Sequence, residues 1–195
     1  MQKTKLLSLL FLLTISQILY AQNKNNIAIS YGLSDNAYIS AMDGSASYNG
    51  EGAKLFEITY YRKLNKRFAL QGGLVYSQNK FTISPAPTGY EIASYKNEIE
   101  MLSIPVYANF TFGKYFFING ALITDFELNR KEFESTDNQS GFGFGSGIGF
   151  RYAYKQVGVF INPFLNIHSL IHFQKDSYQQ HLAEAGIKFG LFYSF

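Results

Sequence analysis

The final eight residues, 188–195, restrict the possible fold more than any other part of this chain. Successive side chains of a β-strand point to opposite faces, so Phe189, Leu191, Tyr193 and Phe195 would share one wholly apolar face. A soluble domain seldom ends on an unprotected apolar strand. A strand of a transmembrane β-barrel faces lipid on one side and the lumen on the other, and needs no further covering layer. The terminus therefore predicts a membrane-spanning β-barrel.

Composition agrees with a barrel built from alternating strands. The chain has 195 residues, 47% hydrophobic and 17% aromatic, which is the size of a single domain. Beyond the N-terminus no apolar run is long enough for a transmembrane helix. The mean hydropathy is close to zero, as expected when apolar and polar residues alternate. A soluble β-sandwich would alternate in the same way and is the alternative.

The N-terminus has the pattern of a secretory signal peptide. Lys3 and Lys5 precede an apolar core over 6–19, and Ala21 offers a small residue at the cleavage point. The apolar core is too short for a comfortable membrane span. We therefore expect a signal peptide at 1–21 that is cleaved on export.

The mature domain, 22–195, then carries little net charge. Two of the 17 basic residues lie in the signal peptide, which leaves 15 basic against 14 acidic residues. This balance does not suggest a nucleic-acid partner. Without Cys the chain has neither a lipoprotein acylation site nor disulfides.

Eight segments of alternating polarity predict eight strands of one antiparallel up-and-down barrel. Each is long enough to cross a bilayer at a tilt, which takes about 9–11 residues. The predicted strands are 26–34, 53–63, 68–80, 97–112, 115–128, 141–154, 157–168 and 182–195.

The connections between these segments alternate in length. A long polar connection follows every odd strand, and a tight turn follows every even one. Outer-membrane barrels have this topology, with long extracellular loops and short periplasmic turns. A soluble sandwich has no reason to place every long connection at one end. The expected extracellular loops are 35–52, 81–96, 129–140 and 169–181.

An eight-stranded barrel encloses a lumen just wide enough for side chains to fill it. The segment 141–154 alternates bulky apolar residues with a glycine stripe from Gly141 to Gly149. Glycines that face a narrow lumen leave room for bulky side chains from opposite strands. A dinucleotide fingerprint would instead need G-x-G-x-x-G before a helix, so no cofactor is expected.

Alternation also assigns charged side chains to the lumen. Charges buried this deeply must pair, because an isolated buried ion is very costly. We expect Arg151 and Lys188 to pair with Glu57, Glu184 or Asp125, as a structural network of five residues. A proton or ion path through switching pairs is the sharper alternative. The full set of polar residues predicted to face the lumen is Glu57, Gln71, Tyr107, Asn109, Asn119, Asp125, Glu127, Arg151, Asn162, Asn166, Glu184 and Lys188.

Three stretches resemble the small Gram-negative outer-membrane β-barrel family, whose eight-stranded members are porin-like or OmpA/OmpX-like. They are 63–70, 102–108 and the C-terminal 188–195. The last resembles the family's assembly signal, with its specified positions filled by Lys188, Gly190, Tyr193 and Phe195. The resemblance implies recognition of this strand by the barrel-assembly machinery, and a place in the cell envelope among outer-membrane lipid and lipopolysaccharide. Within 102–108, Pro105 has no backbone donor, so we expect a bulge there.

Candidate catalytic residues follow the seventh predicted strand. Some barrels of this kind modify lipid A with His, Ser and an acid near the outer rim. Here His168 or His172 could act as base, Ser169 as nucleophile and Glu184 as the orienting acid. Adjacent strand residues point to opposite faces, so His168 and Ser169 should not meet while the strand continues. We expect no enzyme, and no metal site from three scattered histidines.

The leading functional hypothesis is a non-enzymatic outer-membrane protein. It would have a structural role, or bind an unknown extracellular ligand through its long loops. A narrow porin-like channel is the alternative. A lipid A-modifying enzyme and an accessory barrel of a secretion system are further alternatives.

Overall fold

The predicted eight-stranded antiparallel barrel is confirmed by a computed structural model. The structure describes residues 25–40, 46–85, 93–130, 136–174 and 180–195. Each strand pairs with the next along the chain, and β1 pairs with β8 to close the ring. The predicted signal peptide lies outside the described residues. Within them, no helix is long and apolar enough to span a membrane. The strands are β1 (Asn25–Ser40), β2 (Ser47–Lys63), β3 (Phe68–Ser84), β4 (Tyr95–Phe112), β5 (Phe116–Glu127), β6 (Gly141–Tyr154), β7 (Val157–His172) and β8 (Gln180–Ser194).

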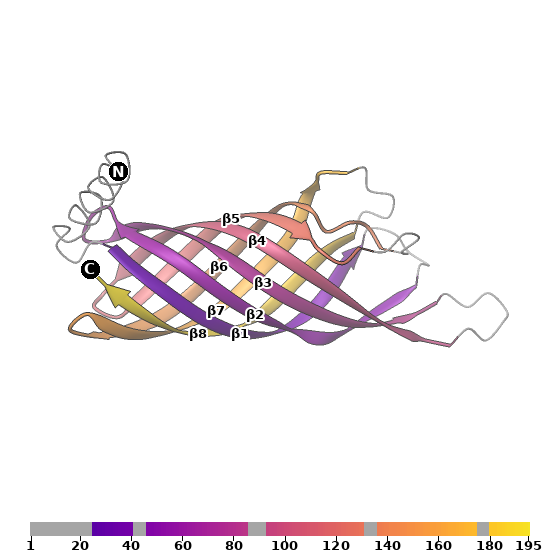
Figure 1. Cartoon of the computed structure of the whole chain (residues 1–195), viewed down its shortest axis with the longest axis horizontal. Helices are drawn as coiled ribbons and strands as arrows, with labels where there is room; N and C mark the ends of the chain where they lie inside the picture. Colours follow the sequence, from indigo (N-terminus) through magenta and orange to yellow (C-terminus); the bar gives the residue numbers. More distant parts are fainter. Residues whose placement is uncertain (1–24, 41–45, 86–92, 131–135, 175–179) are drawn as a thin grey trace, which may run out of the picture.

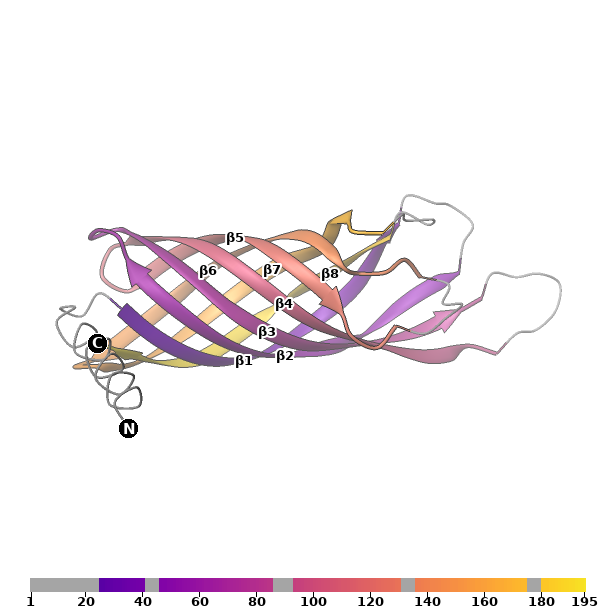
Figure 2. The same ribbon diagram turned by 45° about the horizontal axis from the view of Figure 1, so that its top comes forward.

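The two ends of the barrel differ, as the lengths of the connections predict. The strands tilt around an elongated cylinder, and the chain's C-terminus lies at the end that carries the tight turns (Figure 1). We call this the turn end and the opposite end the loop end. A rotated view shows that β2, β3 and β4 project furthest at the loop end (Figure 2).

The predicted inward and outward faces are also correct. On β1, Ile27, Ile29 and Leu33 are each about half exposed, at 49%, 48% and 54%. The residues between them, such as Ala28 and Ser30, are buried. The same alternation continues around the ring, so the outside of the barrel is an apolar belt. The lumen receives the small and polar side chains.

The strands are longer at the loop end than predicted. β1 continues to Ser40 and β2 begins at Ser47, so most of the expected loop 35–52 is strand. The expected loops 81–96 and 169–181 are shortened in the same way, because β3, β4, β7 and β8 run further. Only 129–140 lies wholly between two strands. The polar composition of these segments suggested loops, yet Phe81 and Ile83, within the expected loop 81–96, still alternate inward and are buried.

Beyond the apolar belt, β2, β3 and β4 form a three-stranded sheet that we call the extension (47–53, 77–84 and 95–101). It begins at a bulge in β2, where Gly52 has a φ of 92° that favours glycine. The Asn36 side chain fills this irregularity: its Oδ1 accepts from the Gly52 N–H at 3.0 Å, and its Nδ2 donates to the Gly52 carbonyl at 3.3 Å. One β1 side chain thus satisfies the backbone where β1 and β2 lose their pairing.

The outer surface of the extension is polar. The Glu51 carboxylate accepts a hydrogen bond from the Thr82 hydroxyl at 2.5 Å and pairs with Lys96 at 3.2 Å. These two hydrogen bonds lower the pKa of Glu51 below its usual value. Three strands are therefore linked on the face that points away from the lumen.

The expected bulge at Pro105 is wrong. Pairing of β3 with β4 skips two positions, between Gly72↔Val106 and Val75↔Ser103, but resumes in the same register. On its other side, Pro105 pairs with Ile123 in an unbroken ladder with β5. The missing donor is accommodated by a local gap in one ladder, without an inserted residue.

A glycine substitution tests the filling of the lumen. A Cβ at Gly149 would meet the Phe117 ring, and would lie 2.7 Å from the Ile161 carbonyl oxygen. We expect Gly149→Val to destabilise the barrel by about 1–3 kcal/mol. Gly72→Val is the matched control, because a Cβ at Gly72 meets nothing within 4 Å.

The measurement is urea unfolding in detergent, followed by the band whose gel mobility changes on boiling. We expect that band to be lost at a lower urea concentration for Gly149→Val than for Gly72→Val. Equal folding of the two variants would contradict a lumen packed around the glycine stripe.

Candidate functional site

The lumen is filled by successive layers of side chains, beginning with Arg151 near the turn end. Its guanidinium donates to the Tyr61 hydroxyl at 2.8 Å and to the Thr111 hydroxyl. It also lies over the rings of Tyr61 and Phe117, with centroid distances of 5.2 and 5.5 Å. Arg151 was expected to pair with a carboxylate, and this expectation is wrong. Hydroxyls and aromatic faces hold the guanidinium instead, because Glu57 is used deeper in the barrel.

The second layer is a buried ion pair at mid-depth. The Lys188 ammonium lies 3.1 Å from Glu57 Oε2 and donates to the Tyr107 hydroxyl at 3.1 Å. That hydroxyl in turn donates to Glu57 Oε1 at 3.0 Å, and Ser30 donates to Oε2 at 3.2 Å. The Lys188–Glu57 pair was among those expected from the sequence. Both carboxylate oxygens are occupied, so the pair satisfies the requirement for burying charge.

The third layer is a His between two carboxylates, closer to the loop end. His168 Nδ1 lies 3.0 Å from Asp125 Oδ1, and Nε2 lies 3.3 Å from Glu184 Oε2. All three residues are almost completely buried. Each ring nitrogen therefore faces a carboxylate oxygen. We call Asp125, His168 and Glu184 the buried triad.

Neutral side chains complete the buried triad. Ser103 donates to Asp125 Oδ1 at 2.6 Å, and Asn79 donates to Glu184 Oε1 at 2.7 Å. Asn36 donates to Asn79 at 2.9 Å, and so connects the triad to the bulge at the base of the extension. Asp125 and Glu184 were expected in the lumen network from the sequence, whereas His168 was not. Alternation along β7 already indicated a lumen position for His168, because it is separated from Asn162 and Asn166 by even numbers of residues and shares their face.

An apolar cluster lies beyond the triad, inside the projecting strands. Tyr38 packs on Phe81 with ring centroids 4.8 Å apart, and also contacts Tyr48. The cluster gives the loop end of the barrel a hydrophobic core of its own. Its buried members are Phe81, Ile99, Met101 and Leu182.

A segment of the β5–β6 connection, residues 136–140, folds over the loop end and forms a cap. Gln139 is fully buried and binds β8 like an additional strand residue. Its Nε2 donates to the Gln180 carbonyl at 3.1 Å, while its Oε1 accepts from the Leu182 N–H at 2.8 Å. β7 has stopped pairing with β8 by this point, after Ile167↔Ala183. The cap therefore closes a gap between two strands.

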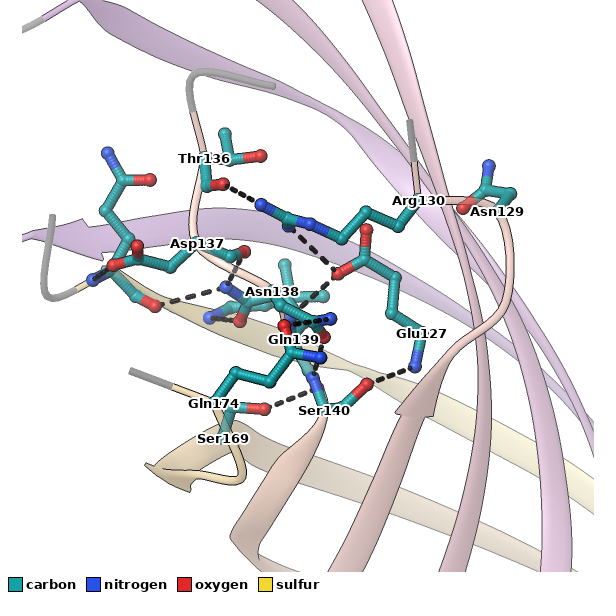
Figure 3. Close-up of polar contacts among 12 residues, drawn as sticks. Glu127, Asn129, Arg130, Thr136, Asp137, Asn138, Gln139, Ser140, Ser169 and Gln174 are labelled. Carbon is teal, nitrogen blue, oxygen red and sulfur yellow. Dashed lines mark hydrogen bonds and ion pairs between the residues drawn. The ribbon is translucent and has the colours of Figure 1, made fainter. Parts of the chain in front are cut away.

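Ion pairs and amides hold the cap in place (Figure 3). Glu127 accepts the Gln139 N–H at 2.7 Å and lies 3.7 Å from Arg130. Arg130 also donates to the Thr136 carbonyl at 2.9 Å. Asp137 accepts the Gln180 N–H at 3.2 Å. The cap is thus joined both to the end of β5 and to the start of β8.

The candidate catalytic residues do not form a nucleophilic site. β7 bulges after Ile167, and Ser169 has a φ of 50° there. Although His168 and Ser169 are both buried, the Ser169 hydroxyl donates to the Gln139 carbonyl, away from the imidazole that binds Asp125. His181 lies 2.8 Å from the Ser169 carbonyl and stacks on His172. Ser169 and the histidines are used to fasten β7 to its neighbours.

Small cavities lie between the layers of the described side chains. One, of about 50 Å³, lies on the turn side and is lined by Arg151, Asn119 and Asn162 among others. Another, of about 10 Å³, lies beside His168 and Glu184. Tyr107 lines both and so separates them. Among the described residues, no group of three or more His, Cys, Asp or Glu side chains could hold a metal ion.

The four residues of the predicted assembly signal lie on both faces of β8. Lys188 and Gly190 face the lumen, where Gly190 leaves space for the Phe160 ring. The side chain of Tyr193 points outward, and its hydroxyl donates to Gln156 at 3.1 Å. Phe195 pairs through its backbone with Asn25, at 3.2 and 2.9 Å. These residues close the barrel, and their recognition by an assembly machinery stays a prediction.

Comparison with known proteins supports the fold. No protein-family model and no curated protein matches the sequence. Among solved structures, Ail of Yersinia pestis in complex with the heparin analogue sucrose octasulfate has a TM-score of 0.53 at 12% identity, covering 87% of this chain and 99% of that chain. AlkL in lipid bilayers has a TM-score of 0.48 at 12% identity, covering 89% and 91%. The outer-membrane protease OmpT of Escherichia coli has a TM-score of 0.43 at 11% identity, covering 90% and 98%. The likeness to Ail shows that this chain has the fold of a small outer-membrane β-barrel.

A double-mutant cycle can measure how much the Lys188–Glu57 pair contributes to the stability of the barrel. Lys188→Met leaves the Glu57 carboxylate buried without its cation, which we expect to destabilise the barrel by about 3–5 kcal/mol. Lys188→Met combined with Glu57→Gln should cost less than the sum of the two single changes, because no unpaired charge remains. Urea unfolding of the refolded proteins in detergent measures all three. Strictly additive effects would show that the pair contributes nothing as a pair.

Proposed function

We propose that this chain is an integral outer-membrane barrel that does not conduct, does not catalyse a reaction, and presents a binding surface at its loop end. The observation that carries this proposal is the filled lumen. Three polar layers, an apolar cluster and the cap follow one another along the barrel. With the interior occupied, the surface available for partners is the outside of the projecting extension.

Placement in the outer membrane rests on the belt and the fold together. Outward residues such as Leu74, Val106 and Leu122 are between 53% and 73% exposed. A continuous apolar exterior of this kind is stable in lipid, and a closed ring leaves no unpaired strand edge there. The short turns would then face the periplasm, and the extension would lie outside the cell.

The filled lumen argues against the channel alternative. An ion would have to pass the Lys188–Glu57–Tyr107 layer, whose polar atoms are bonded to one another. It would then meet the apolar cluster, in which Met101 and Leu182 are fully buried. Passage would require several layers to open together, so the sharper hypothesis of an ion path through switching pairs is not favoured.

The lipid A-modifying alternative is not favoured by the arrangement of the side chains. In a Ser–His–acid site the serine hydroxyl is directed at the imidazole, whereas Ser169 and Ser103 donate to a carbonyl and to Asp125. His168 is enclosed between two carboxylates. An outward-facing substrate would have no access to it.

Charge at the loop end bears on the class of ligand. Ail was solved with a sulfated heparin analogue, but a polyanion would meet net repulsion here. We propose a basic or an uncharged polar partner. The described acidic residues at this end are Asp35, Glu51, Glu98, Glu100, Glu127 and Asp137, against the basic Lys54, Lys80, Lys96 and Arg130.

The absence of Cys allows a direct test of orientation. Asn49→Cys lies on the extension and Lys66→Cys in the first tight turn, and both residues are exposed. A membrane-impermeant maleimide added to intact cells should label Asn49→Cys at once, and Lys66→Cys only after lysis. The reverse pattern would place the extension in the periplasm and overturn the proposal.

Planar-bilayer recording tests the closed lumen. The purified barrel, inserted into a lipid bilayer in concentrated KCl, should show no unitary conductance steps, because the side-chain layers leave no connected path. A porin recorded in the same membrane is the positive control. Reproducible steps of one size, increasing in number with added barrel, would favour the channel alternative.

A further inference from the structure

The turn end carries an unbalanced set of positive charges. Basic side chains lie at all three tight turns and at the strand ends beside them, and all are exposed. Among the described side chains at this end none is acidic, and the nearest acidic side chain, Glu57, is buried in its pair with Lys188. We call these six side chains the basic collar: Arg62, Lys63, Lys66, Arg67, Lys114 and Lys155.

Aromatic side chains lie directly next to the basic collar. The Lys114 ammonium lies 5.2 Å from the centroid of Tyr115, and the Lys155 ammonium 5.6 Å from that of Tyr154. Beside the turn that contains Lys114, the rings of Phe112 and Phe116 stack with their centroids 5.9 Å apart. Aromatic rings gather at the level of lipid headgroups, where one side is apolar and the other wet. The cations therefore lie where the apolar belt ends and the headgroups begin.

The loop end has no such imbalance, so the collar is not a general feature of this surface. There Lys96 is paired with Glu51, and Arg130 with Glu127. The described acidic residues at that end also exceed the basic ones. A preference for anions caused by the protein's charge should therefore be confined to the turn end.

We propose that the basic collar binds the anionic headgroups of phospholipids in the leaflet at the turn end. The collar follows the three tight turns along the barrel rim and adjoins the apolar belt, where a layer of headgroups would surround an inserted cylinder. Exposed lysines and arginines near a negatively charged membrane surface are attracted to it, by a factor on the order of five per residue. This inference rests on the membrane placement proposed above.

The test compares annular lipid selectivity in reconstituted vesicles. The barrel is inserted into phosphatidylcholine vesicles that contain spin-labelled phosphatidylglycerol or spin-labelled phosphatidylcholine, and the motionally restricted fraction is measured by electron paramagnetic resonance. The wild type should prefer phosphatidylglycerol by roughly fivefold. The preference should weaken with added salt, because ions screen exposed charges.

Two variants that each remove three positive charges distinguish the ends. Lys66→Gln/Arg67→Gln/Lys114→Gln should lose most of the preference, while Lys54→Gln/Lys80→Gln/Lys96→Gln should retain it. Insertion of each protein is checked first by its heat-dependent gel mobility. All these positions are exposed, so folding should be preserved.

The outcomes separate this inference from the proposed function. An inserted wild-type barrel without a preference for phosphatidylglycerol overturns the collar as a lipid site and leaves the membrane placement intact. Equal loss in the two variants also overturns it, because the effect would then come from net charge. A wild type that fails to insert at all contradicts the membrane placement, and the inference with it.

Discussion

The structure depends on closure of the β-sheet by the pairing of its first and last strands. In lipid, each unpaired backbone N–H or C=O costs several kcal/mol, so a sheet can cross the membrane only without free edges. β1 and β8 pair from Asn26↔Ser194 to Ser40↔Gln180. This long ladder fixes the number of strands in the ring at eight. The narrow lumen, the glycine stripe and the buried charges all follow from that number.

A narrow ring leaves little space for water to solvate charges, so each charged residue in the lumen needs a partner in the protein. Lys188 and Glu57 are partners of each other, and in the buried triad one imidazole lies between two carboxylates. The partners of Arg151 are hydroxyls and aromatic faces. The layers that result are structural connections between distant strands. Glu57 and Lys188, for example, are 131 positions apart.

The two ends of the barrel have different surfaces because they have different connections. At the turn end, tight turns follow the strands directly, and their basic residues lie beside the aromatic rim. At the loop end, the strands continue past the apolar belt and need a second core, which Tyr38, Phe81 and Leu182 help to form. The cap then supplies, through Gln139, the hydrogen bonds that β7 no longer makes to β8. The polar outer face of the extension remains for partners.

The sequence by itself determined the number of strands, their order, the alternation of long and short connections and the face on which each side chain lies. These properties follow from local alternation, which repeats every two residues whatever the rest of the chain does. The ends of the strands at the loop end could not be predicted in this way, because the polar segments there suggested loops. Only the contact with Tyr38 shows why β3 continues through Phe81.

Tertiary structure decided which lumen residues meet. Alternation placed Asp125, Arg151 and Lys188 in the interior, but the depth of each depends on the stagger between strands around the whole ring. That stagger brought Glu57 to Lys188 and left Arg151 with Tyr61 and Thr111. It also brought His168 between Asp125 and Glu184, which lie on two other strands. The alternation within a single strand cannot predict such a contact between strands.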